Sequence, residues 1–118
     1  MRPGCAIGHV GPLPVSSIQE SVTFYGQFGM RKVMANDAMA ILEMRGGTHL
    51  ILRRAPVSTG RVPFDLMVDD IPGLRDRLVA RGQSPSPIRE GGVHQTFTLK
   101  DPDGRRVAVT SSHAMGPV

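Results

Sequence analysis

Residues 64–82 read FDLMVDDIPGLRDRLVARG, and this stretch decides the fold. Apolar and polar side chains alternate up to Val68, as in a strand with one buried face. Asp70 can then accept a hydrogen bond from the free amides of a helix start, and Pro72 suits the first helical turn. Gly82 can take the left-handed conformation that ends a helix. The stretch therefore predicts a strand followed by one capped helix, with three inward apolar residues: Leu74, Leu78 and Val79.

The same pattern occurs 53 residues earlier, in LPVSSIQESVTFYGQFGM at residues 13–30. Ser17 and Glu20 have the spacing of a capping box, in which each side chain satisfies a free backbone amide, and Gly29 can end the helix. Four pairs of positions share the offset, so the chain contains an internal repeat. The pairs are Val15 and Val68, Ser17 and Asp70, Ile18 and Ile71, and Gly29 and Gly82.

Each predicted helix follows one strand and precedes three. In the first half the strands are predicted at Ile7–Val15, Arg31–Asn36, Ala38–Arg45 and Thr48–Arg53; in the second half at Val62–Val68, Ser84–Arg89, His94–Lys100 and Arg105–Thr110. The turn DPDG, residues 101–104, joins the last two as a hairpin. We therefore predict an α+β fold of two βαβββ modules, residues 5–55 and 61–112 approximately, within one domain of residues 1–118.

Alternation along the strands predicts which side chains face away from the helices. If Leu50 and Leu52 pack under the first helix, the residues between and beside them lie on the opposite face. The same rule applies to the second module. The predicted outward set is His49, Ile51, Arg53, Asp65, Met67, Arg106, Ala108 and Thr110. This face is mixed in polarity, which suits a solvent-accessible cavity better than a second core.

Composition excludes several classes of protein. The chain has 118 residues with a net charge of +4, but its arginines are scattered and it has no Trp, one Tyr and four Phe, so we do not expect a nucleic-acid partner. No apolar run approaches the roughly 18 residues that cross a bilayer. The single Cys5 excludes an internal disulfide. We expect a cytoplasmic protein with no membrane partner.

Three segments together resemble the vicinal oxygen chelate superfamily, which includes glyoxalases, bleomycin-resistance proteins and ring-cleaving dioxygenases. They are residues 13–30, residues 64–82 and FTLKDPDGRRVAV at residues 97–109. The resemblance implies that the sheets of the two modules join into a U-shaped cavity, commonly in a homodimer. It therefore implies a small-molecule ligand and a second copy of the chain as partners.

Metal-using members of that family place one His or Glu ligand on each of the first, fourth, fifth and eighth strands. Carried over position by position, these places fall on Val10, Ile51, Pro63 and Ala108, none of which can bind a metal. The nearest alternative is His9, one residue from the expected place. A one-residue slip turns a side chain to the other face, unless a bulge at Gly11-Pro12 turns it back. We therefore predict no metal and no other cofactor.

His49, Asp65 and Glu43 are the candidate catalytic residues, because a histidine and carboxylates on one cavity face can transfer protons or hold a cation. Alternatively the charges pair with arginines, of which Arg45, Arg53 and Arg106 are available; arginines in a cavity would attract a carboxylate or phosphate. The predicted ligand-binding residues are His49, Arg53, Asp65, Met67, Arg106 and Thr110.

Three functions remain open from the sequence. The first is a metal-free protein that binds and sequesters a small anionic or polar ligand in a dimer cavity. The second is a lyase, isomerase or dioxygenase that uses either a divalent metal at a non-standard site or acid–base chemistry by His49, Asp65 and Glu43. The third is a regulatory or partner-binding module without a pocket.

Overall fold

The structure is a computed structural model that describes residues 9–111, with side chains from residue 10 onwards. Cys5, the predicted strand residues from Ile7 and the outer ends of the two predicted modules lie outside that range. The chain forms two compact units, Met1–Ser58 and Thr59–Val118. Their boundary falls within residues 55–61, the segment between the two predicted modules.

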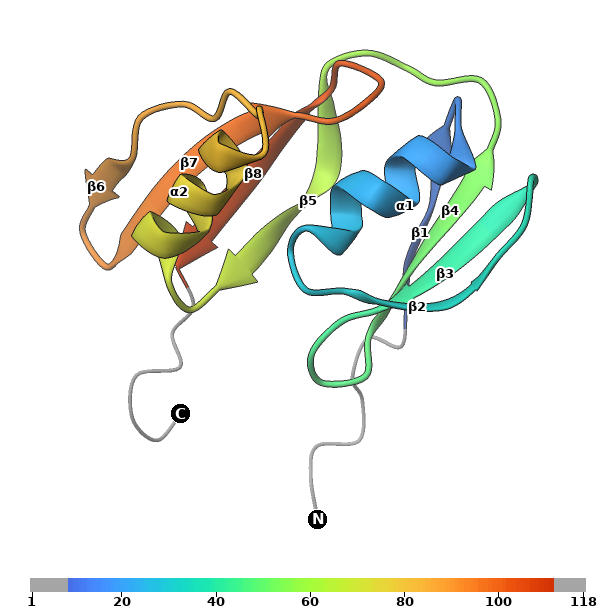
Figure 1. Ribbon diagram of the computed structural model, residues 1–118, viewed down its shortest axis with the longest axis horizontal. Helices are drawn as coiled ribbons and strands as arrows, with labels where there is room; N and C mark the ends of the chain where they lie inside the picture. The colour runs from blue at the N-terminus through green and yellow to red at the C-terminus, as the bar shows by residue number, and fades with distance from the viewer. Residues whose placement is uncertain (1–8, 112–118) are drawn as a thin grey trace. The chain divides into compact units, whose positions relative to one another are not determined.

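The first unit is one four-stranded sheet with a helix on one face (Figure 1). Along the chain it contains β1 (His9–Val15), α1 (Ile18–Gly26), β2 (Arg31–Ala35), β3 (Met39–Glu43) and β4 (His49–Arg54). The strand order is β1-β4-β3-β2, in which β1 and β4 are parallel and the other pairs are antiparallel.

The second unit repeats this plan. It contains β5 (Arg61–Val68), α2 (Ile71–Ala80), β6 (Arg89–Gly91), β7 (His94–Lys100) and β8 (Arg106–Ser111), with the strand order β5-β8-β7-β6. Here β5 and β8 are parallel, as their counterparts are in the first unit. The predicted α+β fold of two βαβββ modules is confirmed.

Both helices begin and end as their local sequence predicts. The Ser17 hydroxyl accepts a hydrogen bond from the Glu20 amide at 3.2 Å, and the Asp70 carboxylate accepts one from the Gly73 amide at 3.0 Å. Each such cap contributes about 1 kcal/mol to the stability of its helix. Gly29 and Gly82, which follow the last turns, have φ angles of +89° and +85°.

Each unit has its core between its helix and its sheet. In the first unit Phe24 and Tyr25 of α1 are both buried and meet edge to face, with ring centroids 4.9 Å apart, and Leu50 and Leu52 of β4 are buried as well. In the second, Leu74 and Leu78 of α2 are buried together with residues of β7 and β8: Phe97, Leu99, Val107 and Val109. Burial of each large apolar side chain contributes about 1.5–3 kcal/mol.

The strand predicted at Ser84–Arg89 is wrong, because β6 covers only Arg89–Gly91. Pro85 and Pro87 have no amide to donate to a ladder. The carbonyls of Pro85 and Ser86 instead accept hydrogen bonds from the Arg75 guanidinium of α2, at 3.1 and 2.7 Å. The Ser86 amide still reaches the Thr98 carbonyl at 2.7 Å, so the segment follows the sheet edge without joining it as a regular strand.

One extra residue in β1 shifts its register against β4. His9 pairs with His49 and Val10 with Leu50, but Leu13 pairs with Leu52, so a bulge lies at Gly11-Pro12. Gly11 has a φ of +114°, and a Cβ atom at this position would lie 2.5 Å from the Ile51 carbonyl oxygen. The bulge therefore depends on glycine, and it places the backbone of His9, not that of Val10, beside His49.

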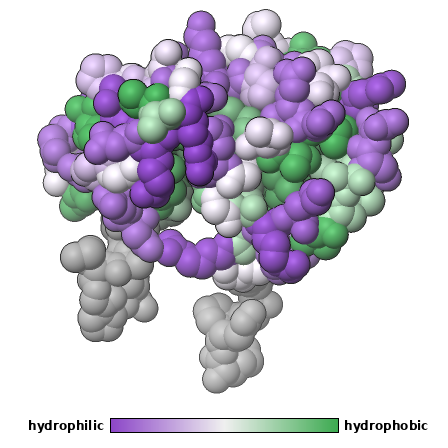
Figure 2. Space-filling view, in the orientation of Figure 1, coloured by the Kyte–Doolittle hydropathy of each residue, from purple (hydrophilic) through white to green (hydrophobic). Residues whose placement is uncertain are grey.

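The surface is mixed in polarity. Figure 2 shows hydrophilic residues over much of the face in view, with smaller hydrophobic areas among them. Of the helices in residues 9–111, neither α1 nor α2 is long and apolar enough to cross a membrane.

Candidate functional site

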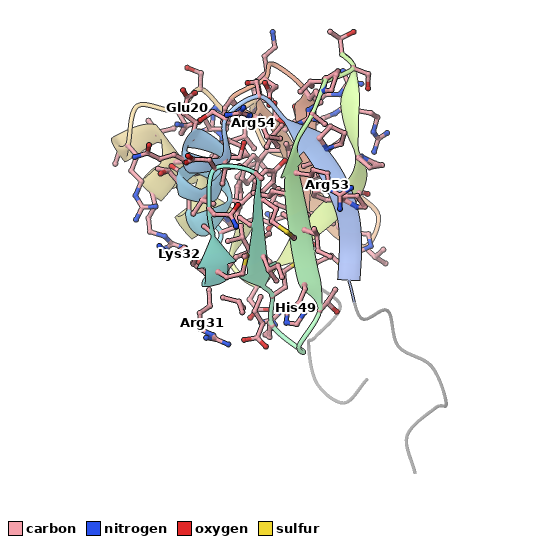
Figure 3. The ribbon with its side chains drawn as sticks, turned by 90° about the vertical axis from the view of Figure 1, so that its right-hand side faces the viewer. Glu20, Arg31, Lys32, His49, Arg53 and Arg54 are labelled. Carbon is pink, nitrogen blue, oxygen red and sulfur yellow. The ribbon has the colours of Figure 1, made fainter. Side chains whose placement is uncertain are left out.

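The candidate site in the first unit is the open face of its sheet, which we define as the face that α1 does not cover. Strand register arranges the open-face side chains in three rows that run across the strands. The first row is Arg31, Glu43 and His49; the second is Met34, Ile41 and Ile51; the third is Met39 and Arg53. Figure 3 shows His49 and Arg31 at one end of the sheet and Arg53 further along β4.

Glu43 links the first row. Its Oε1 accepts hydrogen bonds from Arg31, with the Arg31 Nε at 3.0 Å, and its Oε2 lies 3.7 Å from the His49 Nε2. The Arg31 guanidinium, and to a smaller extent the neighbouring imidazole, lowers the pKa of the Glu43 carboxyl. Glu43 is therefore ionised at neutral pH, and it can orient the His49 ring.

The second row is apolar. Met34, Ile41 and Ile51 are all half-buried, so they offer hydrophobic surface that is still open to solvent. Methionine adapts to ligands of different shape because its side chain is unbranched and polarizable. Arg53, at the far side of this row, is exposed and has no ion-pair partner among the residues that the structure describes. A ligand with an apolar body and an acidic group matches this pattern.

The open face of the second unit, the face that α2 does not cover, is more polar. Its rows are Arg61, Arg106 and Lys100; then Asp65, Ala108 and Thr98; then Met67, Thr110 and Thr96. Asp65 accepts a hydrogen bond from Arg61 at 3.1 Å, and the Thr96 and Thr110 hydroxyls lie 3.3 Å apart. Met67 is 51% exposed.

The hairpin at residues 101–105 fixes the direction of Arg106. The buried Asp101 carboxylate accepts hydrogen bonds from the amides of Asp103 and Arg105 and from the Arg105 Nε, the last at 2.9 Å. Arg105 is itself buried, with its second ion pair to Asp103 at 3.5 Å. Because successive strand residues point to opposite faces, Arg106 then lies on the open face.

Three of the four positions that correspond to family metal ligands offer no side-chain donor atoms, and at the first position the bulge places the backbone of His9 beside His49. Ile51 and Ala108 lie on the open faces of their sheets, Pro63 is exposed on β5, and Val10 pairs with the buried Leu50. Among side chains from residue 10 to residue 111, no three of His, Cys, Asp and Glu lie close enough together to hold a metal ion. The side chains of Ile51, Pro63 and Ala108 therefore cannot coordinate the divalent ion that metal-using members of the family bind. The His9 side chain lies outside the described range.

The structure brings together only part of the predicted catalytic set. His49 and Glu43 are neighbours in the first unit, whereas Asp65 belongs to the second unit and pairs with Arg61. All six predicted ligand-binding residues lie on the open faces, with His49 and Arg53 in the first unit and the other four in the second: Asp65, Met67, Arg106 and Thr110. That they contact a ligand stays a prediction.

Sequence reasoning missed Arg31, Arg61 and Lys100. Arg31 donates a hydrogen bond to Glu43 and Arg61 donates one to Asp65, and these pairs become apparent only when strand register is known. The place of Lys100 could have been predicted from the sequence. Lys100 and Arg106 directly flank the five residues of the closing hairpin, so they lie opposite each other on β7 and β8.

Residues 13–110 match the glyoxalase-like domain family. The chain belongs to this family. It thereby belongs to the superfamily of glyoxalases, bleomycin-resistance proteins and dioxygenases that the sequence resembles. A search of curated proteins found no match to this glyoxalase-like chain.

Solved structures share the fold of this glyoxalase-like protein. A lactoylglutathione lyase from Agrobacterium tumefaciens has 19% identity and a TM-score of 0.76, over 98% of this chain and 100% of that one. TnmS3, an antibiotic binding protein from Streptomyces sp. CB03234, has 19% identity and a TM-score of 0.77, over 94% and 98%. A glyoxalase/bleomycin resistance protein/dioxygenase from Alicyclobacillus acidocaldarius has 20% identity and a TM-score of 0.67, over 96% of both chains.

Proposed function

We propose that this protein is a metal-free member of its superfamily that binds, without transforming it, a small anionic or polar molecule. The observation that carries the proposal is the open face of the first unit, where an apolar row lies between the Glu43–His49 pair and Arg53, which has no ion-pair partner within residues 9–111. Arg53 would bind an acidic group, the apolar row a hydrocarbon body, and His49 a polar group at the other end.

Two further findings support binding without catalysis. Three of the family's four metal positions, those at Ile51, Pro63 and Ala108, hold side chains that cannot ligate, and no cluster of ligands for a metal ion lies among the side chains of residues 10–111. A protein of the same fold, TnmS3, is an antibiotic binding protein. The scarcity of aromatic side chains argues for a ligand smaller than a large planar drug.

Acid–base catalysis is the second candidate, favoured by the 3.7 Å contact between the His49 Nε2 and the Glu43 Oε2. An ionised carboxylate that orients an imidazole is an arrangement that supports proton transfer at the other ring nitrogen. Asp65 would not be needed for this step.

The test compares Arg53→Gln with Arg54→Gln. Arg54 is the next residue of β4, is also exposed, and pairs with the buried Val15, so its side chain leaves the sheet on the α1 side. We expect a thermal-shift screen of small apolar carboxylates to find ligands of the wild type. Calorimetry should then show about fivefold weaker binding for Arg53→Gln and no change for Arg54→Gln. Equal effects of the two substitutions would contradict the proposal.

Two controls separate binding from catalysis. Bound ligands should be recovered unchanged after long incubation; turnover that disappears in His49→Asn would favour the enzyme. Metal analysis of untagged protein should find no stoichiometric divalent ion. A stoichiometric metal that is lost in His49→Ala would refute the metal-free proposal.

A further inference from the structure

Three basic residues lie side by side across the second sheet. Arg61 of β5 pairs with Arg106 of β8, and Arg106 pairs with Lys100 of β7, so the row crosses three adjacent strands. We call this set the cationic row. Lys100 and Arg106 are directly opposite each other on antiparallel strands, where Cβ atoms lie about 4.5–5.5 Å apart and like charges destabilise the sheet.

The nearby acidic residues do not neutralise the whole charge of the cationic row. Asp65 pairs with Arg61 at 3.1 Å and neutralises one of the three charges. Asp101 and Asp103 are turned to the buried Arg105, whose Nε lies 2.9 Å from Asp101. Arg106 and Lys100 therefore have no acidic partner in the part of the chain that the structure describes.

The neighbouring positions of β7 and β8 carry short side chains. The next row of the open face contains Ala108 and Thr98, paired directly with each other, so a residue without a long side chain lies beside a hydroxyl group. Arg106 and Lys100 carry positive charges that the sheet itself does not neutralise, and they lie next to the small Ala108 and the hydroxyl of Thr98. Such a combination of cations and a hydrogen-bond donor suits the binding of an oxyanion.

We infer that the cationic row binds a phosphoryl dianion, as inorganic phosphate or as the phosphate group of a small monoester. The inference goes beyond the proposed function, because it places a further anion site on the open face of the second unit. Two unbalanced cations match the two charges of a phosphate monoester above its second pKa of about 6, whereas a carboxylate would neutralise only one. Arginine and lysine side chains from adjacent strands can converge on separate phosphate oxygens.

The experiment measures the affinity for inorganic phosphate at low ionic strength by NMR shifts of the Ala108 and Thr98 amides. The variant is Arg106→Gln with Lys100→Gln. The matched control is Arg77→Gln, in the last turn of α2, with Arg81→Gln, directly after that helix; both arginines are exposed and their loss changes the net charge equally. We expect about tenfold weaker binding in the first variant and wild-type affinity in the control. Equal losses in both would show a non-specific charge effect and overturn the inference.

Two further arms define the ligand. Affinity should increase severalfold between pH 5 and pH 8, because phosphate gains its second charge over this range. Phenyl phosphate that binds more tightly than inorganic phosphate would identify a monoester as the ligand, and the reverse would identify free phosphate. Benzoate carries a single negative charge. If it binds the cationic row as tightly as phenyl phosphate does, the inference that the row binds a dianion is overturned.

The same measurements distinguish the inference from the proposed function. If small carboxylates bind through Arg53 but phosphate affinity does not depend on Arg106 and Lys100, the inference fails and the proposed function stands. If no small molecule binds the wild type in any arm, the proposed function fails as well.

Discussion

At the scale of single residues, Glu43 has the clearest pH-dependent role. Arg31 lowers the pKa of its carboxyl in the folded protein, and His49 lowers it further. The ion pair therefore stabilises the fold above the unfolded pKa of about 4.3 and is lost as the pH falls through the lower folded pKa. We expect NMR titration of the Glu43 carboxyl to give a midpoint below 4.5.

Substitutions of the two partners check the cause of that shift. Arg31→Gln should raise the midpoint more than His49→Gln, because the arginine is always charged and donates directly to the carboxylate. The Glu43→Gln variant should be less stable against unfolding than the wild type at pH 7, and this difference in stability should disappear at acidic pH. A midpoint that Arg31→Gln leaves unchanged would contradict this account.

Asp101 has the larger structural role. It accepts three hydrogen bonds within the closing hairpin and neutralises Arg105, and both side chains are almost fully buried. Asp101→Asn leaves a buried guanidinium with only the 3.5 Å contact to Asp103. We expect a loss of about 3–5 kcal/mol in the free energy of unfolding, measured by urea denaturation.

Asp103→Asn is the control for Asp101→Asn. Asp103 makes the longer of the two ion pairs to Arg105, at 3.5 Å against 2.9 Å for Asp101. Its substitution should cost less than half as much. A cost equal to that of Asp101→Asn would show that charge alone, rather than the hydrogen-bonded turn, stabilises the hairpin.

At the scale of elements, the bulge in β1 depends on Gly11. Gly11→Ala combines an unfavourable positive φ with a Cβ atom 2.5 Å from the Ile51 carbonyl oxygen, so β1 must move away from β4. We expect a loss of roughly 3 kcal/mol in the free energy of unfolding by thermal denaturation.

Gly29→Ala is the matched control. Gly29 also has a positive φ, of +89°, but a Cβ atom there would meet nothing within 4 Å. Its cost should be about 1 kcal/mol, from the backbone conformation alone. Equal costs at both sites would mean that the close approach of β1 to β4 has no energetic consequence.

The elements that could be predicted are those specified by local chemistry. Both helices follow from caps and periodicity near Ser17 and Asp70, and the open faces follow from strand alternation. The irregular segment before β6 could not be predicted, because its cause lies about ten residues away in the sequence. The Arg75 side chain donates hydrogen bonds to the Pro85 and Ser86 carbonyls, which a regular strand would pair with its neighbour. The partners of Glu43 and Asp65 needed strand register, which the sequence does not state.

At the scale of the whole molecule, the oligomeric state remains a prediction. Each sheet has two edge strands, β1 and β2 in one unit and β5 and β6 in the other, and exposed edges favour pairing with another chain. We expect light scattering at working concentration to give twice the chain mass of 12.7 kDa. A mass of one chain over the whole concentration range would refute the homodimer.

The extra residue in β1 also affects how the chain should be aligned with its relatives. An alignment without gaps, anchored on α1, assigns Val10 to the place beside His49 that His9 takes here. Such an alignment records Val10 at the position where the backbone of His9 pairs with His49. Searches for proteins that share this feature should allow a one-residue gap at Gly11-Pro12, or they will group this chain with relatives that lack it.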